Sequence, residues 1–197
     1  MSAQIPIIAS NRVSEHAKKT LDLVRKFVDE RCIPADAVYH AQIDEGASRW
    51  DHYPSVMEDL KEEAKKLGLW NLFFPRGAYK ESPGFSNLEY GLMAEELGKS
   101  RTGPEACNCA APDTGNMEVL AKYGNEAQKR DWLQPLMDGK IRSAFLMTEP
   151  DIASSDATNI QLSMKREGNE YILNGHVSLD SIPEDGPPAD LNTEMVE

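Results

Sequence analysis

Apolar residues recur at helical spacing along the first 140 residues of the chain, with charged residues between them. In residues 14–32 the apolar positions are Ala17, Leu21, Val24 and Val28. This spacing predicts an amphipathic helix with one buried face, which Ile33-Pro34 is expected to end. A polar stretch follows up to Trp50, in which a further short helix stays open. Further helices are predicted over residues 55–67, 86–98, 113–123 and 125–139. The pattern therefore predicts five helices joined by short connectors.

Start and stop signals mark the ends of these helices. Ser55-Val56-Met57-Glu58 and Ser86-Asn87-Leu88-Glu89 match the capping box, in which a hydroxyl and an acid share the N-terminal N–H groups. Gly68 stands where a left-handed residue ends a helix. Pro135 lies inside the last predicted helix and is expected to bend it or to start its last turn. The dense apolar run over 69–75 is predicted to be buried.

The pattern changes after Ile141. Strands are predicted over 143–148, 161–166 and 170–173, with a turn at Glu167-Gly168-Asn169. Asn174-Gly175 is a strong hairpin signal, but residues 177–182 offer only one short edge strand as its return. We therefore expect only part of a β domain.

The last residues are acidic and rich in proline. From Val177 to Glu197 there are six acids and no Lys or Arg, which is half of the net charge of -12. Such a composition predicts disorder. The fold class is thus predicted to be α+β, with a helical domain over 1–140, a partial β domain over 141–182 and a disordered acidic tail over 183–197.

Charge and composition exclude several classes of function. The net charge of -12 argues against nucleic acid and against anionic membrane surfaces, since both attract Lys and Arg. We expect no transmembrane segment and find no clear targeting signal. Cys32, Cys107 and Cys109 show no framework spacing, which indicates free thiols in a reducing compartment. Cys107-Asn108-Cys109 is too tight for the usual zinc spacing, so no metal site is predicted.

A short apolar run ends at Glu149-Pro150 and opens into a polar loop. The loop holds three hydroxyl residues and two acids, namely Ser154, Ser155, Thr158, Asp151 and Asp156. A strand that ends in such a loop can hold a polar ligand, although the loop has no glycine and is not a phosphate-cradling loop. The pattern is also typical of a strand followed by an Asx or Ser turn. Both interpretations stay open.

Several motifs occur in one order along the chain. They are residues 123–130, Trp132-Leu133-Gln134-Pro135-Leu136, Ala144-Phe145-Leu146-Met147-Thr148-Glu149-Pro150, Ser155-Asp156 and Tyr171-Ile172-Leu173-Asn174-Gly175. Together they resemble the acyl-CoA dehydrogenase family. Trp70-Asn71-Leu72-Phe73 and residues 111–118 further resemble its subgroup of family members ten and eleven. The resemblance extends from about Ser14 to His176.

The resemblance implies FAD as cofactor and acyl-CoA as the class of substrate. The family reaction is FAD-dependent α,β-dehydrogenation of acyl-CoA thioesters in fatty-acid β-oxidation, in which the flavin performs the redox chemistry and the protein orients it. By position, Phe145, Met147 and Thr148 would lie along the flavin ring. Ser154 and Ser155 would lie near the pyrophosphate and the acyl-CoA. Thr148 is alternatively an ordinary hydroxyl at the end of a strand.

After His176 the sequence departs from the family pattern. The family continues with Lys and a Trp-containing strand, where this chain has Val177-Ser178-Leu179. We therefore expect a chain truncated after His176 that lacks the family's catalytic glutamate, and the resemblance assigns no catalytic residue.

Three interpretations of function follow from this departure. One is a dehydrogenase by descent. Another is a non-catalytic module that associates with a full-length dehydrogenase or with itself. The third is an unstable product. The family implies a mitochondrial or peroxisomal compartment, and a cytoplasmic one stays open.

Overall fold

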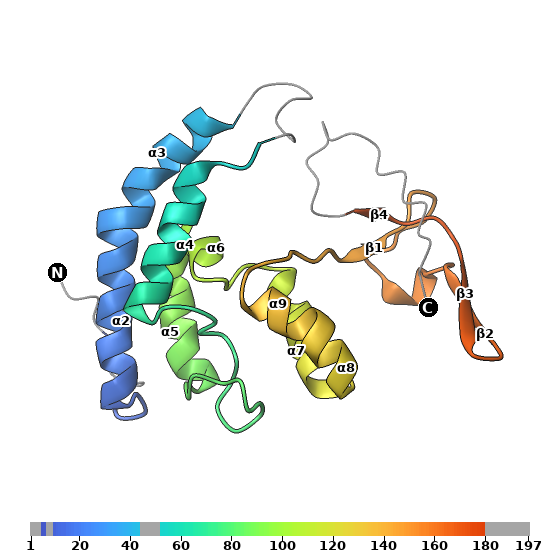
Figure 1. The fold of residues 1–197 in the computed structure, drawn as a ribbon, viewed down its shortest axis with the longest axis horizontal. Helices are drawn as coiled ribbons and strands as arrows, with labels where there is room; N and C mark the ends of the chain where they lie inside the picture. The colour runs from blue at the N-terminus through green and yellow to red at the C-terminus, as the bar shows by residue number, and fades with distance from the viewer. Residues whose placement is uncertain (1–4, 7–9, 44–51, 180–197) are drawn as a thin grey trace. The chain divides into compact units, whose positions relative to one another are not determined.

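The structure is a computed structural model that describes residues 5–6, 10–43 and 52–179. The chain divides into two compact units, Met1–Ser143 and Ala144–Glu197. The first unit is built of helices and the second of short strands (Figure 1). The predicted α+β class is confirmed. The predicted division at residues 140 and 182 stays a prediction, and the acidic tail lies outside the described residues.

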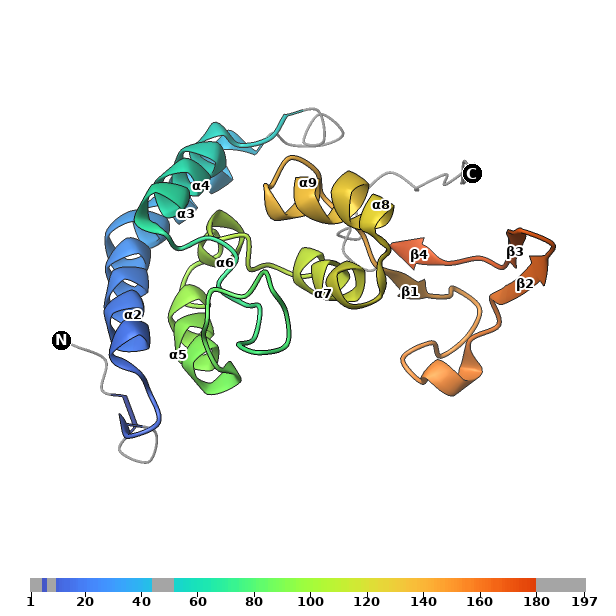
Figure 2. The same cartoon turned by 60° about the horizontal axis from the view of Figure 1, so that its bottom comes forward.

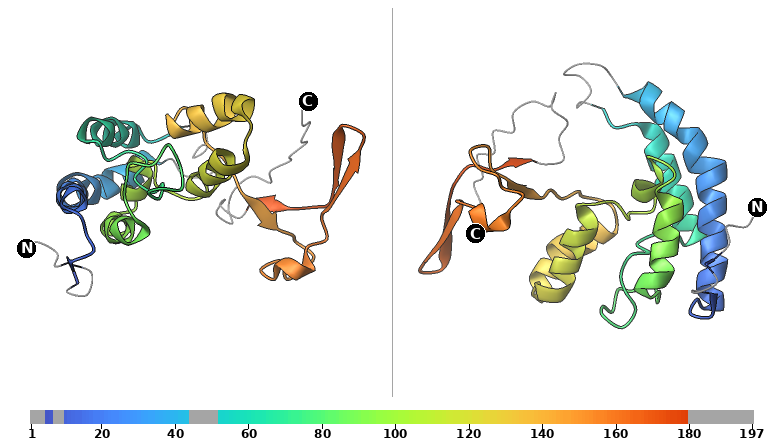
Figure 3. Two further views of the ribbon diagram at one scale, coloured as in Figure 1. Left: turned by 90° about the horizontal axis from the view of Figure 1, so that it is seen from below. Right: turned by 180° about the vertical axis from the view of Figure 1, so that it is seen from behind.

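Helices make up most of the described part of the first unit, and π turns join some of them. Their bounds are α2 (Glu15–Phe27), η1 (Val28–Cys32), α3 (Ile33–Gln42), α4 (Ser55–Leu67), α5 (Asn87–Leu97), α6 (Gly103–Ala106), α7 (Asp113–Tyr123), α8 (Glu126–Gln128), η3 (Lys129–Leu133) and α9 (Gln134–Met137). Helix α2 packs against α5, and α3 packs against α4 (Figure 1; Figure 3). The five predicted helices are confirmed, and the first of them is longer than predicted.

Two prolines lie inside continuous helical stretches, and a π turn precedes each. Turn η1 ends two residues before Pro34, and η3 ends two residues before Pro135. In η1 the Ile33 N–H donates to the Val28 carbonyl, five residues back. The wider turn makes room for a proline ring that would clash with the carbonyl four residues back. The prediction that Ile33-Pro34 ends the first helix is therefore wrong, whereas Pro135 starts a last turn as predicted.

One of the two predicted capping boxes is present. The Ser86 hydroxyl accepts from the Glu89 N–H at 3.3 Å, and the Glu89 carboxylate accepts from the Ser86 N–H at 2.8 Å. The prediction for Ser55 is wrong, because α4 begins at Ser55 itself. There the Gln42 side chain accepts from the Val56 N–H at 3.0 Å. A side chain from the end of α3 thus satisfies an N–H group that the helix leaves unpaired.

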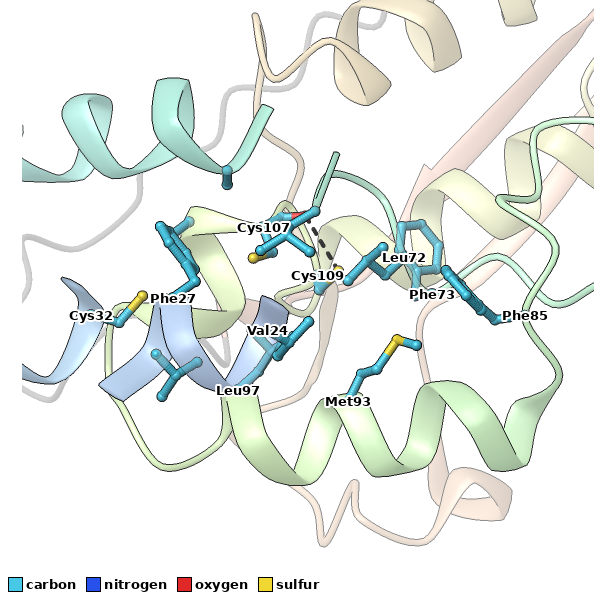
Figure 4. Packing of buried hydrophobic residues seen from close by; sticks show 14 of the residues in the cluster. Val24, Phe27, Cys32, Leu72, Phe73, Phe85, Met93, Leu97, Cys107 and Cys109 are labelled. Carbon is cyan, nitrogen blue, oxygen red and sulfur yellow. Dashed lines mark hydrogen bonds between the residues drawn. The ribbon is translucent and has the colours of Figure 1, made fainter. Parts of the chain in front are cut away.

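The core of the first unit is an apolar cluster (Figure 4). It contains Val24 and Phe27 of α2, Leu72 of the loop after α4, and Met93 of α5, all of them buried. Burial of one such side chain contributes roughly 1.5–3 kcal/mol, so this cluster supplies most of the apolar stabilisation of the unit. The predicted burial of the run over 69–75 is confirmed for the large side chains at its centre, which join the cluster.

The second unit consists of two separate antiparallel pairs (Figure 2). Its elements are β1 (Leu146–Thr148), the 3-10 turn η4 (Ala157–Asn159), β2 (Ser163–Glu167), β3 (Glu170–Asn174) and β4 (Ser178–Leu179). The hairpin turn lies between β2 and β3, where Gly168 has φ +66°. After Asn174-Gly175 the chain does not fold back on β3, since β4 pairs with β1 instead.

The carbonyl of Met137, at the end of α9, accepts hydrogen bonds from several side chains of the first unit. It accepts from Trp70 Nε1 at 2.7 Å, Asn71 Nδ2 at 2.9 Å and Asn108 Nδ2 at 3.4 Å. Asn71 and Asn108 both have positive φ, a conformation that asparagine tolerates better than most residues. The junction fixes the last helix against the loops that carry these side chains.

The Glu89 side chain accepts hydrogen bonds at the beginnings of two helices. Its carboxylate accepts from the N–H of Ser14, the N-cap of α2, at 2.8 Å, and from Ser86, the N-cap of α5. Burial alone would raise the pKa of Glu89, but these donors outweigh it and lower the pKa from 4.5 to about 2. The charged carboxylate is therefore the form that the fold stabilises.

We predict that Glu89→Gln lowers the free energy of unfolding at neutral pH by about 2 kcal/mol, because a charged acceptor of N–H groups is lost. Because its pKa is depressed, Glu89 stabilises the fold above pH 4.5, and this contribution is lost as pH falls toward about 2. Denaturation followed by circular dichroism should thus show a smaller gap between variant and parent in acid. Exposed Glu95 on the same helix provides the control Glu95→Gln. A gap independent of pH would contradict this account.

We also predict that Gly139→Ala destabilises the first unit more than Gly77→Ala. Both glycines have positive φ (+73° and +79°), so alanine is strained at both, at a cost of roughly 1–2 kcal/mol. Only at Gly139 would the added Cβ lie 2.8 Å from the Trp70 ring, which adds roughly 1–3 kcal/mol of overpacking. Thermal denaturation of both variants measures the difference. Equal losses of thermal stability in the two variants would show that the Trp70 ring moves aside without cost, and would contradict this prediction.

Candidate functional site

The residues expected along a flavin ring lie on and beside strand β1. Phe145 precedes the strand and is 54% exposed, and Met147 within it is 38% exposed. Leu146 between them is 40% exposed as well, and the pairing of β1 with β4 is irregular between Leu146 and Thr148. The three apolar residues therefore form one exposed apolar segment. Thr148 ends the strand, is half-buried and pairs in register with Ser178 of β4.

Glu149 closes the loop that follows β1. Its side chain is buried, and its carboxylate accepts from the N–H of Gln161 at 3.0 Å and of Leu162 at 2.8 Å. The N–H of Glu149 itself donates to the Ser154 hydroxyl at 2.9 Å. The two ends of the loop are therefore held together through one residue.

The two serines that are expected near the pyrophosphate, Ser154 and Ser155, differ in their surroundings. Ser154 is 4% exposed, with its hydroxyl turned inward to the Glu149 N–H, whereas Ser155 is exposed. Asp156 accepts from the N–H of Thr158 at 3.0 Å and from its hydroxyl at 2.7 Å, which lowers the pKa of Asp156. This is the Asx-type turn that the pattern also predicted. The roles assigned to Ser154 and Ser155 stay predictions.

Sequence reasoning missed the part played by Glu149. From the sequence, the pair Glu149-Pro150 indicated only the end of a strand. The signal that was present is an acid at the boundary between an apolar strand and a loop rich in N–H donors, where a buried carboxylate finds partners. Its actual partners are 12 and 13 residues away, beyond the reach of local patterns.

Other candidate chemistry in the described residues is limited. They contain no group of three His, Cys, Asp or Glu side chains placed to hold a metal ion. None of the helices in the described part of the chain has the length and apolar character needed to cross a membrane. The three thiols are buried, and burial raises the pKa of Cys32 and of Cys109 to about 12. They therefore remain protonated and unreactive at neutral pH.

The helical first unit followed by a few strands is the arrangement of a known family of dehydrogenases. The family profile "Acyl-CoA dehydrogenase, N-terminal domain" matches residues 14–140. This chain therefore belongs to the acyl-CoA dehydrogenase family, whose members are FAD-dependent.

Individual relatives agree with this assignment. Acyl-CoA dehydrogenase family member 11 from Gallus gallus is 50% identical over 165 residues, which cover 82% of this chain and 20% of that protein. Family member 10 from Mus musculus is 43% identical over 173 residues, covering 86% and 16%. The chain thus spans about a fifth of the length of these relatives. The predicted resemblance to family members ten and eleven is confirmed.

A solved structure supports the fold as well. A protein from Mycobacterium abscessus, described as an acyl-CoA dehydrogenase, superposes with a TM-score of 0.73 at 43% identity. The match covers 83% of this chain and 41% of that one. The helical N-terminal domain followed by a few strands is thereby confirmed.

We predict that Glu149→Gln opens the loop after β1. A neutral amide accepts more weakly than a carboxylate, so the two N–H groups that it holds lose roughly 1 kcal/mol of protection. Hydrogen exchange at Gln161 and Leu162 should become roughly fivefold faster. The control is Asp151→Asn, since Asp151 is exposed in the same loop. Unchanged exchange at both amides would show that Glu149 does not hold the loop.

Proposed function

We propose that this chain supplies the helical domain and the flavin-facing strand of an FAD-dependent acyl-CoA dehydrogenase. The observation that carries the proposal is β1 with its family motif, because Phe145, Leu146 and Met147 form an exposed apolar segment next to Thr148. An apolar segment of this kind suits the flat ring system of a flavin, and a hydroxyl at its end suits the polar edge of that ring.

The residues present fit the cofactor in part. Phe145 and Met147 would pack along the ring, and Thr148 would bond its polar edge through its hydroxyl and backbone. Exposed Ser155 is accessible to a pyrophosphate group, while Ser154 shapes the loop through its bond to Glu149. When bound, the flavin would accept the hydride that leaves the acyl-CoA thioester.

No described acid is assigned as the catalytic base of this proposal. A base must reach the substrate proton and lie in a site from which water is excluded. The buried Glu149 is held by backbone N–H groups, and Asp156 by Thr158. The proposed contribution of this chain is therefore binding and orientation. We also propose that the protein acts in mitochondria or peroxisomes, the compartments that the family implies.

The experiment compares FAD affinity of the parent chain and of Thr148→Val. Loss of one hydrogen bond to the cofactor is expected to raise the Kd roughly three- to tenfold. Quenching of flavin fluorescence measures binding, and far-ultraviolet circular dichroism checks that helix content is unchanged. The matched control is Thr20→Val, because the Thr20 hydroxyl donates to its own helix at the His16 carbonyl. Equal affinity in parent and Thr148→Val would refute the assignment of Thr148.

The β2–β3 hairpin favours a second candidate function, that of an interaction module. Every residue of both strands is exposed, including Met164 at 64% and Tyr171 at 56%. Apolar surface of this kind is typical of an interface. Co-purification with a full-length dehydrogenase, lost on Met164→Ser and Tyr171→Ser, would favour this function. Retained co-purification in that double variant would count against it.

A further inference from the structure

Strand β3 has an edge that no described strand covers. The sheet that holds β2 and β3 has two strands (Figure 2), so within residues 144–179 no third strand pairs with the outer side of β3. All five residues of each strand are exposed. An isolated two-stranded hairpin is only marginally stable in water, and an unpaired edge offers its N–H and C=O groups to another strand.

This edge lacks the features that protect edge strands in native proteins. Such features are Lys or Pro on the edge and a β-bulge that twists it away. Strand β3 contains neither Lys nor Pro, and its five pairs with β2 follow one another without a shift in register. Its three central residues, Tyr171, Ile172 and Leu173, are 56%, 47% and 43% exposed. The edge is therefore open to the addition of a strand.

The backbone groups at the free edge belong to Tyr171 and Leu173. A two-residue turn joins β2 to β3, so the pair next to the turn exchanges hydrogen bonds within the hairpin. Such pairs alternate along the strands with pairs that exchange none. The N–H and C=O groups of Ile172 therefore point toward β2, and those of Tyr171 and Leu173 point to the free edge.

The sequence of β3 is complementary to itself in antiparallel order. When two copies of β3 run antiparallel about Ile172, all five residues of each strand are used, and Tyr171 of one copy lies opposite Leu173 of the other. Both residues have outward backbone groups, so each of these pairs exchanges two hydrogen bonds. Apolar side chains lie opposite each other at the centre. Glu170 lies opposite Asn174, so no like charges meet.

The edge of β2 does not fit a second copy in this way. Two copies of β2 in the equivalent antiparallel register would place Lys165 opposite its own counterpart, and like charges directly opposite each other are destabilising. Pairing β2 of one copy with β3 of another leaves a free edge at each end, whereas two β3 strands related by a two-fold axis close as a dimer. Charge and closure therefore both favour β3.

We propose that two copies of this chain associate through their β3 strands into one four-stranded antiparallel sheet. Ile172 of each copy meets its counterpart at the two-fold axis. The dimer does not depend on the flavin proposal. It shares the hairpin with the interaction-module function, but it uses the edge of β3 and is measured on the purified chain alone.

The first test compares the self-association of the parent, Leu173→Pro and Met164→Pro by analytical ultracentrifugation. The mean mass of the parent is expected to rise toward that of a dimer between roughly 10 µM and 1 mM, the range of weak contacts. Leu173→Pro removes an outward N–H from each copy, so association is expected to weaken roughly thirtyfold. Met164 lies opposite Leu173 on β2, so Met164→Pro is the matched control and should leave association unchanged.

A second test uses Ile172→Cys, which retains every backbone group of the hairpin. Opposite residues of a pair that exchanges no hydrogen bonds have Cα atoms about 4.5 Å apart, which a disulfide can span. The three native cysteines are buried. Oxidised glutathione is therefore expected to cross-link Ile172→Cys into a dimer on a non-reducing gel. Lys165→Cys, opposite Ile172 on β2, is the control and is expected to stay monomeric.

Several results would overturn the proposal. One is a parent chain that stays monomeric up to about 1 mM. Another is an equal loss of association in Met164→Pro, which would indicate contact through the apolar face of the hairpin. Cross-linking of Lys165→Cys as readily as of Ile172→Cys would contradict the register. Each of these failures leaves FAD binding and co-purification with a full-length dehydrogenase standing, because neither requires two copies of this chain.

Discussion

Buried and half-buried carboxylates that accept backbone N–H groups are the interaction on which both units of this chain depend. Asp36 accepts from the N–H groups of Arg101 and Thr102, and Glu89 from those at the starts of two helices. Glu149 does the same for the loop after β1. Unpaired N–H groups are costly when they are buried, and a charged acceptor is stronger than a neutral one. Hydrogen bonds from Ser100 and Thr102 outweigh burial and lower the pKa of Asp36.

Local patterns predicted the helices well where both partners of an interaction are close in sequence. The capping box of Ser86 and Glu89 spans three residues, so the sequence shows it directly. The capping box predicted at Ser55 is absent, because the acceptor for the Val56 N–H is the side chain of Gln42, fourteen residues earlier. Similarly, Pro34 indicated an end to the first helix, whereas a π turn in the preceding residues lets the helix continue.

At the candidate site, too, local sequence patterns do not show interactions between residues that are distant along the chain. Motifs predicted that Phe145, Met147 and Thr148 share one strand, and the structure places them on or beside β1. They did not predict that Ser154 turns inward or that Glu149 holds the loop, because both depend on how a long loop closes. The hairpin signal at Asn174-Gly175 failed for a related reason, since pairing with β1 competes with pairing to β3.

The central claim is that β1 is the strand that contacts the flavin, and amide hydrogen exchange with and without FAD tests it most directly. Binding along this strand predicts slower exchange over residues 145–149 when FAD is added, with the β2–β3 hairpin unchanged. Protection confined to the hairpin or to the helical unit, or no protection at saturating FAD, would contradict the claim.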